Sequence, residues 1–110
     1  MGIASSRTSR SLNYFVERME LSMFFKYIVG CEDVPLCKPA PDAVNFIMRQ
    51  CRVDPNETLV VGDMPVDIQM AHAAGCHACA VTYGNSSKET LLSIHPDCII
   101  DSPLQLLSYL

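Results

Sequence analysis

Hydrophobic residues in this chain fall into two patterns: short consecutive apolar runs, and longer stretches with apolar positions spaced three and four residues apart. Short β-branched runs between turn residues are typical of strands buried on both faces. These runs predict strands at residues 1–5, 27–30, 58–62, 77–82 and 98–100.

The second pattern predicts amphipathic helices between the strands. Its clearest example is the set Leu12, Phe15, Val16 and Met19, which forms one helical face. The same spacing, or an N-terminal capping residue followed by an apolar stretch, predicts further helices near residues 44–51, 65–74, 86–94 and 102–110. Strict alternation of strand and helix indicates the α/β class, with a Rossmann-like parallel sheet and helices on both faces.

Composition narrows the function classes. The chain has 110 residues, of which 49% are hydrophobic, so it can form at most one domain with a core. The net charge is −4 and no basic patch occurs, which argues against a nucleic-acid partner. No apolar run has the length of a membrane span, and the first residues favour a strand over a leader peptide. We expect a cytoplasmic location and no membrane partner.

The six cysteines are expected to be reduced. Cys51 and Cys79 fall in apolar patterns and Cys98 precedes a strand, which is typical of small buried side chains in a reducing cytosol. Cys76 and Cys79 have the spacing of a zinc or redox motif. No second pair with that spacing follows, so a buried strand is favoured.

Four residues near the predicted carboxyl ends of strands could carry chemistry: Ser5, Lys38, Asp63 and Asp67. In a parallel sheet these ends meet at one edge, where ligands bind. A hydroxyl, an ammonium group and two carboxylates suit a phosphoryl group with a hard cation such as Mg²⁺. Each residue also has a structural alternative: Ser5 as a turn residue, Lys38 as a solvated lysine, Asp63 as a helix cap and Asp67 as a first-turn acid.

The motifs around these residues resemble those of the haloacid dehalogenase-like (HAD) hydrolase superfamily, in its phosphoglycolate phosphatase and β-phosphoglucomutase branch. Ile-Ala-Ser-Ser ending at Ser6 is similar to its second motif, and Lys-Pro-Ala-Pro-Asp from Lys38 to its third. Gly-Asp at Asp63, with Asp67, is similar to its fourth. The resemblance implies that Ser5 binds the phosphoryl group and Lys38 neutralises it. It also implies that Asp63 ligates Mg²⁺ with support from Asp67, and that the substrate is a small phosphorylated metabolite.

The resemblance covers residues 1–110 as a partial core domain. The family's first motif is a central strand ending in Asp-x-Asp, which supplies the nucleophile, and no Asp-x-Asp occurs in this sequence. The cap domain is missing as well. We therefore expect the C-terminal half of a Mg²⁺-dependent phosphatase, inactive alone because the aspartyl-phosphate intermediate cannot form. The alternatives are a catalytically dead binding or regulatory module and, less favoured, a flavodoxin-like binding domain.

A missing central strand would leave a gap between the strands that end at Ser5 and Gly62. Three outcomes are open at this point. The flanking strands close onto each other, another chain fills the gap as in a homo-oligomer or strand-swapped dimer, or the sequence is a piece of a longer protein.

Overall fold

The computed structural model describes residues 1–109, in which strands alternate with helices as predicted. The strands are β1 (Gly2–Ala4), β2 (Tyr27–Val29), β3 (Leu59–Gly62), β4 (His77–Val81) and β5 (Cys98–Ile100). The α-helices are α1 (Ser9–Arg18), α2 (Asp42–Cys51), α3 (Pro65–Ala73) and α4 (Lys88–Ser93). Short 3₁₀ helices are η1 (Cys31–Asp33), η2 (Pro55–Glu57) and η3 (Pro103–Tyr109).

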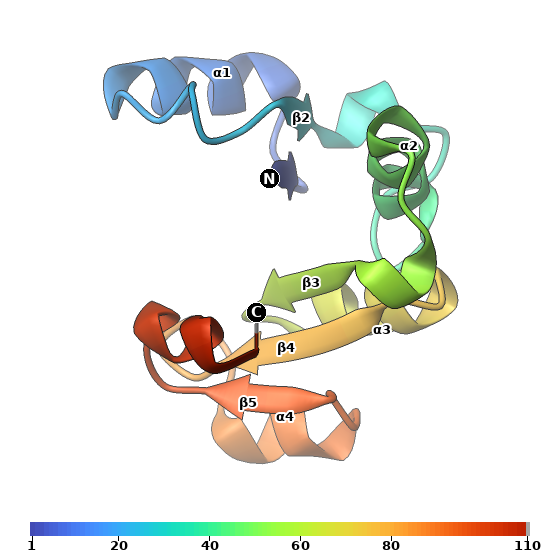
Figure 1. Cartoon of the computed structure of the whole chain (residues 1–110), viewed down its shortest axis with the longest axis vertical. Helices are drawn as coiled ribbons and strands as arrows, with labels where there is room; N and C mark the ends of the chain where they lie inside the picture. Colours follow the sequence, from blue (N-terminus) through green and yellow to red (C-terminus); the bar gives the residue numbers. More distant parts are fainter. Residues whose placement is uncertain (110) are drawn as a thin grey trace.

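The strands form two separate sheets. β1 pairs with β2, and β3, β4 and β5 form the other sheet in that order, with every pairing parallel. β1 and β3 are not paired with each other, and Figure 1 shows the two sheets apart. The α/β class with parallel strands is thus confirmed. The chain does not close β1 onto β3.

Both faces of the larger sheet are covered. Ala78 and Ala80 of β4 point into a core with Ile68 of α3 and Leu91 of α4, and all four are fully buried. The alternate residues of β4, Cys79 and Val81, pack on the opposite side with Ile100, and Leu106 of η3 lies against them. In Figure 1, α3 and α4 accordingly lie behind the sheet and η3 in front of it. This period of two is the pattern of a strand between two layers.

Local sequence signals explain most helix ends. Pro65 occupies the first turn of α3, and Gly75 follows its end with a φ of +75°, a left-handed conformation that favours glycine. α4 departs from the expected start, because the capping hydroxyl is that of Ser87, not Ser86, and accepts from the Thr90 N–H. The final helix, expected to be α-helical, is the 3₁₀ helix η3.

The expectation of six reduced cysteines is wrong at two positions. Cys31 and Cys37 form a disulfide with their Cα atoms 5.4 Å apart, and Cys51, Cys76, Cys79 and Cys98 are free. Cys31 and Cys37 lie in the loop after β2, outside any apolar pattern. Among the free thiols, Cys79 is buried as expected and Cys98 is partly buried, but the expectation of a buried Cys51 is wrong because this residue is exposed. Within residues 1–109, no helix is long and apolar enough to cross a membrane.

Candidate phosphoryl and metal site

Lys38 and Asp67 meet as an ion pair, with Nζ 2.5 Å from Oδ1. Lys38 comes from the loop before α2 and Asp67 from the first turn of α3. Both side chains are largely shielded, with 15% and 10% exposed. Charged groups removed from water to this degree interact more strongly than surface pairs, because less solvent screens them.

The backbone holds Asp67 in place from two further directions. Its Oδ2 accepts from the N–H of Met64, the residue before α3, which satisfies one free donor at the helix start. Gly62, the last residue of β3, lies so close that an added Cβ would overlap the Asp67 side chain. The first-turn role considered for Asp67 is therefore real, and the same carboxylate also binds Lys38.

Asp63 does not cap α3. Its Oδ2 instead accepts two hydrogen bonds from Asn85, from the backbone N–H at 2.9 Å and from Nδ2 at 2.8 Å. Gly84 stands next to it, and any Cβ there would overlap the Asp63 side chain. Asn85 and Gly84 follow β4, so Asp63 joins the ends of two neighbouring strands.

Asn85 is a partner of Asp63 that the sequence analysis did not identify. The available signal was its position in a Gly-Asn-Ser loop directly after a strand that neighbours β3. Parallel pairing places that loop at the same sheet edge as Asp63.

Ser5 stands apart from these contacts. Its Oγ accepts from the N–H of Arg7 at 3.1 Å, which is the turn role considered for it. Ser5 follows β1, which lies in the smaller sheet, whereas Asp63 follows β3 in the larger one. The structure therefore brings Lys38 to Asp67 directly but does not join Ser5 to them.

The carboxylates of Asp63 and Asp67 provide some, but not all, of the ligands that a hard cation such as Mg²⁺ needs. Within residues 1–109, no three histidine, cysteine or acidic side chains converge as a metal cage would. Asp63 and Asp67 are oxygen donors, and each already accepts hydrogen bonds. Mg²⁺ commonly binds one or two protein carboxylates and completes its coordination shell with water and substrate oxygens. Asp63 and Asp67 could therefore provide the smallest set of protein ligands that such a site needs.

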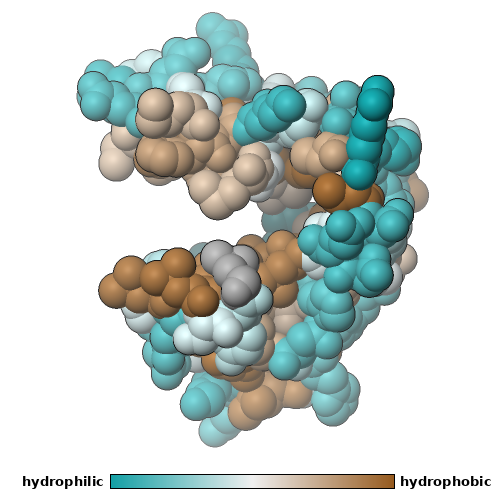
Figure 2. All heavy atoms as spheres, viewed as in Figure 1, coloured by the Kyte–Doolittle hydropathy of each residue, from teal (hydrophilic) through white to brown (hydrophobic). Residues whose placement is uncertain are grey.

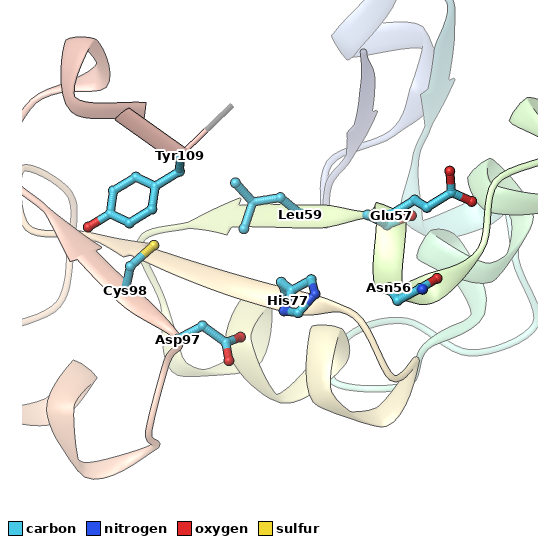
Figure 3. A pocket seen from close by; sticks show the side chains of 8 residues that line it. Asn56, Glu57, Leu59, His77, Asp97, Cys98 and Tyr109 are labelled. Carbon is cyan, nitrogen blue, oxygen red and sulfur yellow. The ribbon is translucent and has the colours of Figure 1, made fainter. Parts of the chain in front are cut away.

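A separate pocket of about 320 Å³ lies at the opposite edge of the larger sheet. The pocket is lined by His77 at the start of β4, by Asp97 just before β5 and by Cys98 at its start, together with Glu57 and Tyr109 (Figure 3). Asp97 uses its carboxylate to accept from the Ala78 N–H, which links β4 to the loop before β5. This pocket contains none of the four predicted site residues.

Comparison with known proteins agrees with this architecture. The family model of the haloacid dehalogenase-like hydrolases matches residues 1–81. A phosphoglycolate phosphatase of Pseudomonas putida is 32% identical over 101 residues, which are 92% of this chain and 37% of that protein. The chain belongs to the haloacid dehalogenase-like hydrolase family.

Solved structures show the same fold. A crystal structure described as a predicted phosphoglycolate phosphatase from Haemophilus somnus has a TM-score of 0.91 and 24% identity, over 98% of this chain and 48% of that one. A haloacid dehalogenase-like family hydrolase from Streptococcus pneumoniae has a TM-score of 0.83 and 25% identity, over 94% of this chain and 49% of that one. The chain thus spans less than half the length of each of these proteins.

Proposed function

We propose that this chain provides the phosphoryl- and metal-binding half of a Mg²⁺-dependent phosphatase that hydrolyses a small phosphate monoester. The observation that carries the proposal is the Lys38–Asp67 pair with Asp63 nearby in sequence at the end of β3. Phosphoryl transfer depends on positioning and charge neutralisation, and an ammonium group beside carboxylates offers both. The relatives named phosphoglycolate phosphatase favour a small organic phosphate as substrate.

In this proposal, Lys38 neutralises phosphoryl oxygens, while Asp63 and Asp67 hold the cation. Bound Mg²⁺ would supply positive charge against the phosphate oxygens. Asp67 also orients Lys38, and Asn85 fixes the Asp63 carboxylate through two hydrogen bonds. Ser5 would contact the phosphoryl group from the smaller sheet. We place the chain in the cytoplasm, where the Cys31–Cys37 pair would be exposed to reducing conditions.

The chain alone is proposed to be inactive, because its sequence has no Asp-x-Asp to supply a nucleophile. The test is hydrolysis of p-nitrophenyl phosphate with Mg²⁺. We expect no release of p-nitrophenol above buffer. Turnover that disappears in Asp63→Asn would contradict this part of the proposal.

Binding tests the remaining part independently of turnover. Inorganic phosphate with Mg²⁺ should broaden its ³¹P resonance in the presence of the chain, and Lys38→Met should abolish the broadening. Lys26→Met is the matched control, since Lys26 is an exposed lysine away from Asp67. Equal broadening by both variants would mean that Lys38 does not bind phosphate.

A second candidate is a non-catalytic binding or regulatory module on the same scaffold. It is favoured by the Lys38 charge already being matched by Asp67. The coding sequence immediately upstream distinguishes the two. A preceding in-frame strand that ends in Asp-x-Asp supports the phosphatase, and a stop codon before any such segment supports the module.

A further inference from the structure

The loop between β2 and α2 carries a disulfide directly before Lys38. Its two cysteines, Cys31 and Cys37, have a sequence separation of 6, and Cys37 is the residue before Lys38. We call residues 30–41 the disulfide loop. Small thiols can reach the bond from solvent, because Cys37 is exposed and Cys31 is partly buried. Exposed disulfides are the labile ones, and those that form in a reducing cytoplasm are commonly catalytic or redox-sensing.

The Cys31 end of the disulfide loop is held against the start of α1. The Cys31 N–H donates to the Arg7 carbonyl at 3.1 Å. Oε1 of Glu32 accepts from the Ser9 N–H and from the Ser9 hydroxyl, both at 2.6 Å. Gly30 lies so close to this helix start that an added Cβ would overlap the Ser9 backbone nitrogen. The disulfide therefore attaches the other end of the loop to a fixed point.

The Cys37 end has weaker attachments of its own. Leu36 is 62% exposed, so its side chain adds little apolar packing. The Leu36 N–H donates to Oδ2 of Asp42 at 3.2 Å, and the Ala40 N–H donates to the Cys37 carbonyl at 3.0 Å. Water competes for an exposed bond such as that of Leu36, which reduces its net contribution. The covalent link to Cys31 therefore contributes strongly to the position of this end of the loop.

Lys38 connects the two sheets from this end of the loop. An open cleft of about 620 Å³ separates β1 from β3, and both Lys38 and Asp67 line it. Figure 2 shows the molecule open on one side and closed on the other, where Figure 1 places α2 and the loop before it. Lys38 comes after β2 of the smaller sheet and Asp67 after β3 of the larger one, so their ion pair joins the two.

We propose that the Cys31–Cys37 disulfide is a redox switch for the phosphoryl-binding site. In the oxidised chain, the bond restricts the loop and keeps Lys38 beside Asp67, in position for phosphate. In the reduced chain, the loop before Lys38 moves more freely and Lys38 binds phosphate more weakly. This inference rests on the proposed binding of phosphate by Lys38, and it adds regulation of that site by small thiols and disulfides.

The switch operates by thiol–disulfide exchange with a small dithiol. A thiolate of the dithiol attacks the exposed Sγ of Cys37, the sulfur–sulfur bond breaks, and Cys31 leaves as a thiolate that takes up a proton. The second thiol of the reagent then loses its proton and attacks the mixed disulfide, and Cys37 leaves and takes up that proton. The protein gains the two electrons that the dithiol loses in becoming a cyclic disulfide. A small disulfide such as oxidised glutathione reverses these steps.

The first test is whether the chain has two folded states. Dithiothreitol is added at neutral pH, thiols are counted, and far-UV circular dichroism is recorded before and after. We expect the thiols of Cys31 and Cys37 to appear without loss of the circular dichroism signal, and to disappear again with oxidised glutathione. Unfolding on reduction would overturn the proposal, because a switch needs two folded forms.

Amide hydrogen exchange reports on the loop without any phosphate. We expect the Leu36 and Ala40 amides to exchange about fivefold faster or more in the reduced chain, because ordering the backbone of even one residue has a free-energy cost of that size. The Val60 amide, in β3 of the larger sheet, should exchange at the same rate in both forms. Equal exchange of the Leu36 and Ala40 amides in the two forms would overturn the proposal.

Phosphate binding tests the effect on the site. Line broadening of the ³¹P resonance of inorganic phosphate with Mg²⁺ is titrated with the oxidised and the reduced chain. We expect reduction to weaken binding by about fivefold or more, since the loop must then be ordered on binding. Cys37→Ser cannot form the bond and should match the reduced chain with or without dithiothreitol. Cys51→Ser is the matched control, because it removes an exposed free cysteine and should respond to dithiothreitol like the unsubstituted chain.

The outcomes distinguish the switch from the proposed function. Equal or tighter binding by the reduced chain would overturn the switch alone and leave phosphate binding by Lys38 intact. Absence of binding by both forms would overturn the proposed phosphate binding and the switch with it. Loss of the dithiothreitol response in Cys51→Ser would also overturn the proposal, because it would assign the response to a cysteine outside the disulfide loop.

Discussion

The Lys38 ammonium nitrogen lies 2.5 Å from Oδ1 of Asp67, across 29 residues of sequence. This contact fixes the loop before α2 to the first turn of α3. It also affects phosphate binding by Lys38. A lysine that is already paired with a carboxylate interacts with a phosphate as part of that ion pair and not as an isolated cation.

Removing the Asp67 charge should destabilise the fold. Asp67→Asn leaves Lys38 without its ion-pair partner but keeps an oxygen for the Met64 N–H. We expect the free energy of unfolding in urea to fall by about 1–3 kcal/mol, and Asp67→Ala, which loses both contacts, to cost more. Asp63→Asn is the control, since it keeps an acceptor for Asn85 and leaves the ion pair intact. An equal loss in Asp63→Asn would argue against a structural role for the pair.

Gly62 should not tolerate alanine. The added Cβ would overlap the Cβ and Cγ of Asp67, which the Met64 N–H and Lys38 both hold in position. Overpacking of this kind costs typically about 1–3 kcal/mol in urea unfolding. Gly2→Ala is the matched control, because its Cβ would meet the Ile47 side chain at 3.0 Å and the Tyr27 carbonyl oxygen at 3.4 Å, without overlapping either as it would at Gly62. Similar losses in both variants would contradict the close approach at Gly62.

A thiol count should show the disulfide directly. Without reductant, the folded chain should react quickly at the exposed Cys51. Burial raises the pKa of Cys76, and burial together with Cys98 raises the pKa of Cys79 to about 12, so these thiols should be slow. Unfolding without reductant should release four reactive thiols, and unfolding with reductant six. Six thiols before reduction would show that Cys31 and Cys37 are not joined.

The disulfide should also stabilise the chain. It closes a loop with a sequence separation of 6, for which chain entropy gives about 2 kcal/mol. Cys37→Ser in urea should lower the free energy of unfolding by about this amount relative to the oxidised protein. Adding reductant to the unsubstituted chain is the control and should produce a similar loss. No change under either condition would mean that the bond does not constrain the unfolded chain.

Glu32 should make stability depend on pH in acid. Hydrogen bonds from the Ser9 hydroxyl and then from backbone N–H groups lower the pKa of this carboxyl below its ordinary value of 4.5. A group with a lowered folded pKa stabilises the protein above its ordinary pKa, and that contribution is lost as the pH falls through the folded pKa. Urea midpoints for the chain and Glu32→Gln should therefore differ at neutral pH and converge as the pH falls through the lowered pKa of Glu32.

Two further variants test the cause of this dependence. Ser9→Ala removes the largest contribution to the pKa shift and should reduce the gap between neutral and acid stability. Glu17→Gln, an exposed position on the same helix, should leave the gap unchanged. A constant difference between the chain and Glu32→Gln across the acid range would mean that Glu32 titrates alike in the folded and unfolded states.

Most of the fold could be predicted because its signals are local. The consecutive apolar residues of β4 and the spaced apolar residues of α1 depend only on which faces are buried. The exceptions depend on competing local contacts. The helix α4 begins one residue later than expected, because the hydroxyl of Ser87 and not of Ser86 accepts from the Thr90 N–H. The last helix, η3, is a 3₁₀ helix and not the α-helix expected there.

The sequence predicts four candidate site residues but not the contacts that they make in the structure. Asp67 is predicted as either a first-turn acid or a site residue. In the structure its Oδ2 accepts from the Met64 N–H at the helix start and its Oδ1 contacts Lys38. Ser5 was grouped with Lys38 on the assumption of one continuous sheet edge. The division into two sheets separates Ser5 from Asp63, so these two residues do not lie at one continuous sheet edge.

The sequence by itself determined the order and type of the elements and the family motifs around Lys38 and Asp63, because these follow from side-chain periodicity and short-range spacing. Only the tertiary structure decided the Cys31–Cys37 bond, the Asn85 contacts to Asp63 and the open cleft between β1 and β3. Each of these depends on how distant segments approach in space. The spacing of apolar residues along one strand gives no information on the distance between segments that are far apart in the sequence.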